Sequence, residues 1–100
     1  MIKVVIEKDK DNFKSVSILG HAMYADYGKD IVCAAASSIA TTTINGILSL
    51  NKESLKYDVS KEGLVITINS NDKNTQLLIE NMINLLKELE SEYPTNIEVK

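Results

Sequence analysis

The sequence contains one histidine and one cysteine, and their spacing suits acyl-transfer chemistry. His21 precedes Cys33 by twelve positions. We expect His21 to end a strand and Cys33 to lie in the first turn of a helix, with one short loop between them. A thiol at a helix N-terminus ionises more readily, because the unpaired backbone N–H groups there favour an anion. An imidazole within hydrogen-bond reach of this thiol would complete the nucleophile–base pair of a cysteine hydrolase.

The same two residues also have simpler interpretations. A cysteine in an apolar helix is commonly a small core residue, which would leave the protein a non-catalytic interaction module. A low-pKa exposed thiol could instead be a redox sensor, although the chain holds no second cysteine to resolve it. A zinc site made of His21, Asp26, Asp30 and Cys33 is disfavoured, because structural zinc prefers more sulfur and nitrogen ligands. Hydrolase, interaction module and redox sensor therefore remain as three alternatives.

Hydrophobic periodicity predicts the elements that position these side chains. A period of two indicates strands near residues 2–7, 13–20, 55–59 and 64–68, with a short strand at 97–99. Helical spacing indicates one helix that follows Asp30 as its N-cap and runs to Leu50, and a second that follows residues 71–74 and ends before Pro94. The order β-β-α-β-β-α-β predicts an α+β fold, a two-layer sandwich with both helices on one face of the sheet.

Each helix is expected to turn one apolar face to that sheet. The three alanines at 34–36 make the first helix thin, so that it can lie close to the strands. Helical spacing predicts its buried face at Val32, Ala35 or Ala36, Ile39, Thr43, Ile47 and Leu50. The corresponding face of the second helix is predicted at Leu78, Met82, Leu85, Leu86 and Leu89.

Composition limits the remaining classes of protein. The 100 residues predict a single domain spanning 1–100, and one cysteine excludes an internal disulfide scaffold. All 11 basic residues are lysines, they are scattered, and 14 acidic residues outnumber them, so we expect no direct nucleic-acid partner. We find no apolar run near the roughly 20 residues of a membrane span and no signal-peptide pattern, which predicts a cytoplasmic protein without a membrane partner. No cofactor is expected.

Two stretches of the sequence resemble a known family. Gly20-His21-Ala22 is followed, after a short loop, by the stretch Asp30-Ile-Val-Cys33-Ala-Ala-Ala-Ser37. The pattern resembles the ribosomal-processing cysteine protease family, called Prp, and the resemblance covers the whole chain. Either stretch alone is a weak signal, whereas the two at this separation are specific. Ala36, where the family often has valine, is a small departure.

The resemblance implies a cysteine endopeptidase that removes the N-terminal extension of a large-subunit ribosomal protein, number twenty-seven, during ribosome assembly. The extension carries an apolar stretch that ends in two phenylalanines, and the cut falls before a following alanine. By this resemblance Cys33 is the nucleophile and His21 the general base, Asp30 and Ser37 match further motif positions, and the protein forms a homodimer.

The neighbouring residues receive supporting roles from their chemistry. Asp30 would cap the helix that presents the thiol, and Ser37, one turn after Cys33, could orient the site by a hydrogen bond. Gly20 would allow the backbone to approach closely at the strand end. The loop 22–29 is the expected lid, in which three apolar or aromatic side chains would contact a phenylalanine-rich peptide: Met23, Tyr24 and Tyr27.

Overall fold

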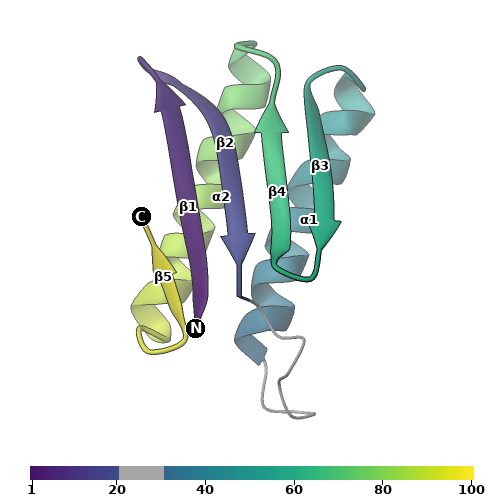
Figure 1. Cartoon of the computed structure of the whole chain (residues 1–100). Coiled ribbons are helices and arrows are strands. Elements are labelled where there is room, and N and C mark those ends of the chain that lie inside the picture. The colour runs from purple at the N-terminus through teal and green to yellow at the C-terminus, as the bar shows by residue number, and fades with distance from the viewer. Residues whose placement is uncertain (21–30) are drawn as a thin grey trace.

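The computed structural model describes residues 1–20 and 31–100. These residues form five strands and two helices in the predicted order β-β-α-β-β-α-β (Figure 1). The strands are β1 (Ile2–Asp9), β2 (Asn12–Leu19), β3 (Leu55–Ser60), β4 (Gly63–Ile68) and β5 (Ile97–Val99). The helices are α1 (Ile31–Leu50) and α2 (Lys73–Glu92), and both cover the same face of the sheet. The predicted two-layer α+β sandwich is confirmed.

The five strands form one sheet in the order β3-β4-β2-β1-β5. The hairpin β1–β2, the pair β2–β4 and the hairpin β3–β4 are antiparallel, and β5 pairs in parallel with β1. The central strand is therefore β2, which lies between β4 and β1. The two edge strands are β3 and β5. The sheet order requires pairing between residues that are far apart in the sequence.

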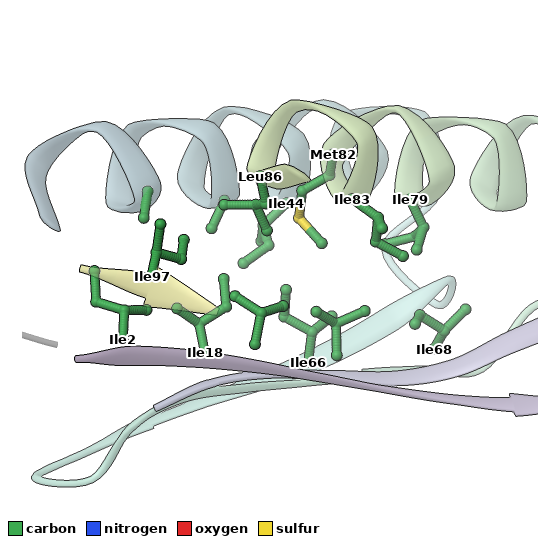
Figure 2. Packing of buried hydrophobic residues seen from close by; sticks show 14 of the residues in the cluster. Ile2, Ile18, Ile44, Ile66, Ile68, Ile79, Met82, Ile83, Leu86 and Ile97 are labelled. Carbon is green, nitrogen blue, oxygen red and sulfur yellow. The ribbon is translucent and has the colours of Figure 1, made fainter. Parts of the chain in front are cut away.

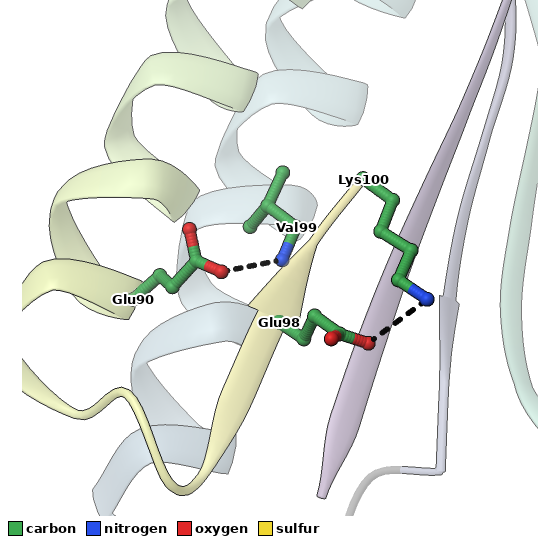
Figure 3. A network of polar contacts seen from close by, with 4 residues as sticks. All are labelled: Glu90, Glu98, Val99 and Lys100. Carbon is green, nitrogen blue, oxygen red and sulfur yellow. Dashed lines mark hydrogen bonds and ion pairs between the residues drawn. The ribbon is translucent and has the colours of Figure 1, made fainter.

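The short edge strand β5 is fastened to the helix layer by one side chain of α2 (Figure 3). Glu90 of α2 accepts a hydrogen bond from the backbone N–H of Val99 at 3.0 Å. Directly after β5, the Lys100 ammonium lies 3.5 Å from a carboxylate oxygen of Glu98, in a partly exposed pair. A strand of only three residues thus gains a polar anchor in addition to its pairing with β1.

The core lies between the helices and the sheet and is rich in isoleucine (Figure 2). Alternate residues of each strand face the helices, because successive side chains of a strand point to opposite faces. This alternation buries Val4, Val16 and Ile66 completely. The strand side of the core consists of Ile2, Val4, Val16, Ile18, Leu55, Ile66, Ile68 and Ile97.

The buried faces of both helices differ from the predicted ones. Leu50, predicted to be buried, is 69% exposed at the last position of α1, and Leu85 of α2 is 38% exposed while its neighbour Leu86 is fully buried. In α1, small residues such as alanine make part of the contact with the sheet, because they let the helix backbone lie close to the strands. Its buried residues are Val32, Cys33, Ala36, Ala40, Ile44 and Ile47, and those of α2 are Thr75, Ile79, Met82, Ile83 and Leu86.

The helix α1 differs from the expectation that no apolar run approaches the length of a membrane span. Its 20 residues, with a mean hydropathy of 1.6, are long and apolar enough to cross a membrane by length and composition alone. The expectation that no segment approaches this length was wrong, because serine and threonine lower the hydropathy of the helix only modestly. A third of the apolar window is buried inside the fold, where it packs on the sheet, and a core helix passes the same test.

Candidate active site

Cys33 lies in the first turn of α1, which begins at Ile31, as the sequence predicted. The side chain is 6% exposed and belongs to the buried hydrophobic cluster. The backbone N–H groups of a first helical turn have no partner within the helix, so they form a positive environment beside this thiol. The thiol is therefore held firmly by packing. The helix N-terminus favours negative charge on its sulfur, whereas burial among apolar side chains opposes it.

Five of the predicted site residues lie outside the described part of the chain. The contact between His21 and Cys33 stays a prediction, as do the cap by Asp30 and the lid made by Met23, Tyr24 and Tyr27. A zinc site that would use Cys33 with His21, Asp26 and Asp30 also depends on those positions. Among residues 1–20 and 31–100, no three side chains of the histidine, cysteine, aspartate and glutamate types gather as metal ligands would.

Gly20 directly follows β2 and has a conformation that suits glycine. Its φ is +77°, and a Cβ atom at this position would lie 2.8 Å from the carbonyl oxygen of Met1. Its N–H donates a hydrogen bond to the carbonyl oxygen of Glu62, at 2.9 Å. The residue directly before His21 is therefore held between the N-terminal strand and the turn that connects β3 to β4.

A hydrogen bond in that turn lowers the pKa of a carboxyl group. The Ser60 hydroxyl donates to a Glu62 carboxylate oxygen at 2.9 Å, and this hydrogen bond lowers the pKa of Glu62 below its ordinary value. A bond from its own backbone N–H acts in the same direction. The side chain is exposed, so solvent screens its charge. The turn beside Gly20 thus carries an anion throughout the neutral range.

Ser37, one turn after Cys33, is exposed and faces a hollow that the sequence analysis missed. This hollow has a volume of about 340 Å³ and lies between α1 and the edge strand β3. A second hollow of about 790 Å³ follows along the same two elements, and Asn45 and Tyr57 line both. We call the two together the α1–β3 groove. Its residues are Ser37, Thr41, Ile44, Asn45, Leu48, Ser49, Lys52, Leu55, Lys56, Tyr57, Val59 and Leu64.

The sequence held one signal for this groove. Leu55, Tyr57 and Val59 alternate along a predicted strand, which indicates that they share a face. The structure buries Leu55 but leaves Tyr57 and Val59 53% and 67% exposed. An apolar strand face that continues beyond its core contact is typical of a binding surface. The sequence could not show this, because the exposure depends on where α1 crosses the sheet.

Comparison with known proteins decides the family. Residues 1–98 match the family model described as cysteine protease Prp. The chain belongs to the cysteine protease Prp family. A curated relative, the ribosomal processing cysteine protease Prp of Staphylococcus aureus, is 34% identical over 89% of this chain and 87% of its own. The Bacillus subtilis protein of the same name is 28% identical over 99% and 96%.

Solved structures agree with this family and extend over all of this chain. The Staphylococcus aureus Prp in complex with a substrate peptide has a TM-score of 0.86 at 32% identity, covering 98% of that chain. The same protein with a covalently linked product peptide has a TM-score of 0.87. A Streptococcus mutans protein has a TM-score of 0.83 at 30% identity, covering 92% of its chain. This Prp family member is thus a cysteine protease, which decides among the three alternatives in favour of catalysis.

Proposed function

We propose that this protein removes the N-terminal extension of large-subunit ribosomal protein number twenty-seven during ribosome assembly, with Cys33 as nucleophile and His21 as general base. The printed names of its relatives, ribosomal processing cysteine proteases, support this class of substrate. The observation that carries the assignment of the nucleophile is the position of Cys33, the chain's single cysteine, in the first turn of α1.

The proposed reaction follows the chemistry of cysteine proteases. His21 takes the proton of the Cys33 thiol, and the thiolate sulfur attacks the carbonyl carbon of the scissile peptide bond. Backbone N–H groups of the first turn of α1 hold the oxyanion that forms. His21 then gives its proton to the leaving amine, and the new N-terminus departs. Water, deprotonated by His21, attacks the thioester and releases the other product with regeneration of the thiol.

The remaining residues of the motif position this chemistry. Asp30 caps α1 and so fixes the turn that presents the thiol. Ser37 lies one helical turn beyond Cys33 and offers a hydroxyl at the edge of the site. In the loop before α1, Met23, Tyr24 and Tyr27 close over the apolar part of the peptide. The protein acts in the cytoplasm as a homodimer, without direct contact to nucleic acid or membrane.

The test of this proposal is cleavage of a synthetic peptide that spans the extension and its junction, followed by mass spectrometry. Cys33→Ala and His21→Ala each remove half of the reacting pair, so kcat/KM should fall by at least about 10³-fold. The matched control is Ser38→Ala, an exposed serine of the same helix, which should cleave at the wild-type rate. Cleavage by Cys33→Ala at a rate near wild type would remove Cys33 as the nucleophile.

A second measurement separates the role of His21 from that of Cys33. The rate at which iodoacetamide alkylates Cys33 reports the reactivity of the thiolate. His21→Ala should slow this alkylation near neutral pH, because the imidazole no longer assists ionisation. An alkylation rate equal to that of the wild type, in a folded His21→Ala variant, would show that His21 does not activate the thiol.

A further inference from the structure

The outer edge of β3 has no strand beside it within the described part of the chain. Ser54 and Asn69, just beyond the β3–β4 ladder, form a hydrogen-bonded pair, with the Asn69 N–H donating to the Ser54 carbonyl at 2.8 Å. Hydrogen-bonded and non-hydrogen-bonded pairs alternate along an antiparallel ladder. The pairs Tyr57–Ile66 and Val59–Leu64 are therefore non-hydrogen-bonded. It follows that Tyr57 and Val59 direct their backbone N–H and C=O groups away from the sheet.

The side chains of the same two residues line the groove. Tyr57 and Val59 lie on the helix-facing side of β3, like the buried Leu55, but α1 leaves them more than half exposed. Free edges in natural proteins usually carry charged or proline residues that discourage pairing. The outward-directed positions of β3 instead combine free backbone groups with apolar side chains. This combination is what recognition by strand addition requires.

The near end of the groove lies one turn of α1 beyond Cys33. Ser37 lines this end. The groove extends from there to Lys52, beyond the end of the helix. At the opposite edge of the sheet, β5 has only three residues and is fastened to α2 through Glu90. Within the described part of the chain, β3 is the edge strand that lines the hollow reached by Ser37.

We propose that the α1–β3 groove binds the substrate as an added strand, with its backbone paired to Tyr57 and Val59 and its alternate apolar side chains in the hollow beside α1. The proposal rests on the proposed protease function and names its specificity surface. The substrate class that follows is an extended peptide with apolar side chains at every second position on one side of the scissile bond. Thr41 and Asn45 line the hollow with polar groups.

The first test compares two valines of neighbouring strands. Val59 faces the groove, whereas Val65 of β4 is 37% exposed and pairs with Asp58, which places it on the opposite face of the sheet. Val59→Lys should raise KM for the extension peptide on the order of tenfold with kcat unchanged, since it removes binding shared by ground and transition states. Val65→Lys should stay within about twofold of wild type, and Val59→Ile should preserve KM.

The outcomes of this test are distinct from those of the proposed function. If the wild type cleaves the peptide and both lysine variants have the same KM, the groove does not bind substrate and the proposal is overturned alone. If the wild type does not cleave the peptide at all, the proposed function fails and takes this proposal with it. Far-UV circular dichroism of both variants confirms the fold, because lysine is well tolerated on exposed strand positions.

The second test probes the backbone pairing itself. A series of peptides carries one N-methyl group each, at successive positions of the apolar segment. Alternate N–H groups of an added strand donate to the edge strand, so KM should rise and fall with a period of two along the series. A uniform effect along the series, or none, would contradict strand addition.

A second copy of this chain is the other possible occupant of the groove. Sedimentation equilibrium of wild type and Val59→Lys tests this at several protein concentrations. The proposal expects the same mass for both proteins. A lower mass for Val59→Lys, with activity that recovers as its concentration rises, would assign β3 to a contact between copies and overturn the proposal.

Discussion

At the scale of single residues, Cys33 is a core residue in a protein that is also a cysteine protease, although the sequence analysis treated a core cysteine and a protease as alternatives. It is a buried member of the core, 6% exposed, and it is the single cysteine of a cysteine protease. Interiors are packed as densely as organic crystals, so a thiol held by core neighbours has little freedom to move. Burial in the core thus fixes the position of this thiol at the start of α1.

Glycine substitutions test the geometry of the strand end next to His21. Gly20→Ala places a Cβ 2.8 Å from the Met1 carbonyl oxygen at a φ of +77°, so we expect the free energy of unfolding to fall by about 1–3 kcal/mol. Gly46→Ala is the matched control, since it lies in α1 with no atom within 4 Å of an added Cβ. It should raise that free energy by about 0.5–1 kcal/mol.

Urea denaturation followed by circular dichroism measures both changes. If Gly20→Ala is as stable as wild type, the backbone at the end of β2 does not need its positive φ, and the close approach to Met1 does not constrain the site. We also expect Gly20→Ala to lower kcat more than KM, because the displaced residue is the one that precedes His21. Gly46→Ala should leave both kinetic constants unchanged.

At the scale of elements, one side chain replaces missing strand pairing. The strand β4 pairs with β2 only over Ser15–Leu19, and a register shift interrupts the β1–β2 ladder between Glu7 and Lys8. Phe13 lies beyond the end of β4. Gln76 of α2 accepts from the Phe13 N–H at 2.7 Å and donates to the Phe13 carbonyl at 3.2 Å. Its amide therefore pairs with β2 as a neighbouring peptide group would.

The contribution of this pairing can be measured by Gln76→Met, which keeps the length of the side chain and removes its hydrogen bonds. The Gln76 amide also donates to the Ser70 carbonyl at 2.9 Å, so three bonds are lost. We expect the free energy of unfolding to fall by about 1–3 kcal/mol. Amide hydrogen exchange at Phe13 should become faster. Glu80→Met, on the exposed next turn of α2, should change stability by less than about 0.5 kcal/mol.

Hydrogen exchange at Phe13 that is as slow in Gln76→Met as in wild type would contradict this assignment. The variant Glu80→Met is the control for any general effect of a methionine substitution on the stability of α2. Urea denaturation gives the free energy of unfolding for both variants.

Elements were predictable from the sequence to the extent that they depend on local patterns. The alternation of Val16 and Ile18 and the turn at residues 9–12 predicted the first hairpin, and the expected start of α1 after Asp30 agrees with the structure. Sheet order was not predictable, since the pairing of β2 with β4 joins residues between 44 (Leu19 and Gly63) and 52 (Ser15 and Thr67) positions apart. The α1–β3 groove depends on that order and on the path of α1, so composition and spacing could not reveal it.

At the scale of the whole molecule, both helices share one core with one sheet. Residues from every strand and both helices belong to the same buried cluster, which includes Cys33 of α1. Figure 2 shows Met82 and Leu86 of α2 in this cluster. The two helices also contact each other along the layer. Loosening α2 therefore removes part of the packing that holds α1. The reactivity of the Cys33 thiol should therefore report unfolding of the whole core. This reactivity tests the prediction of a single domain over 1–100.

Adjacent leucines of α2 give this test its matched pair. Leu86 is fully buried, whereas Leu85 is 38% exposed. Leu86→Ala removes buried methylene groups and leaves a cavity, so the free energy of unfolding should fall by about 2–5 kcal/mol. Leu85→Ala loses only part of its burial and should cost less than about 1 kcal/mol. Guanidinium denaturation followed by far-UV circular dichroism measures both.

The decisive comparison is between that helix signal and the reactivity of Cys33 toward a chromogenic disulfide at each denaturant concentration. In one cooperative unit all probes change together, so the Cys33 transition should coincide with the helix transition in wild type. Leu86→Ala should shift both to lower denaturant by the same amount, although Leu86 lies on the other helix. A Cys33 transition that stays in place while the helix signal shifts would divide the chain into two units, and it would contradict a single core that holds Cys33.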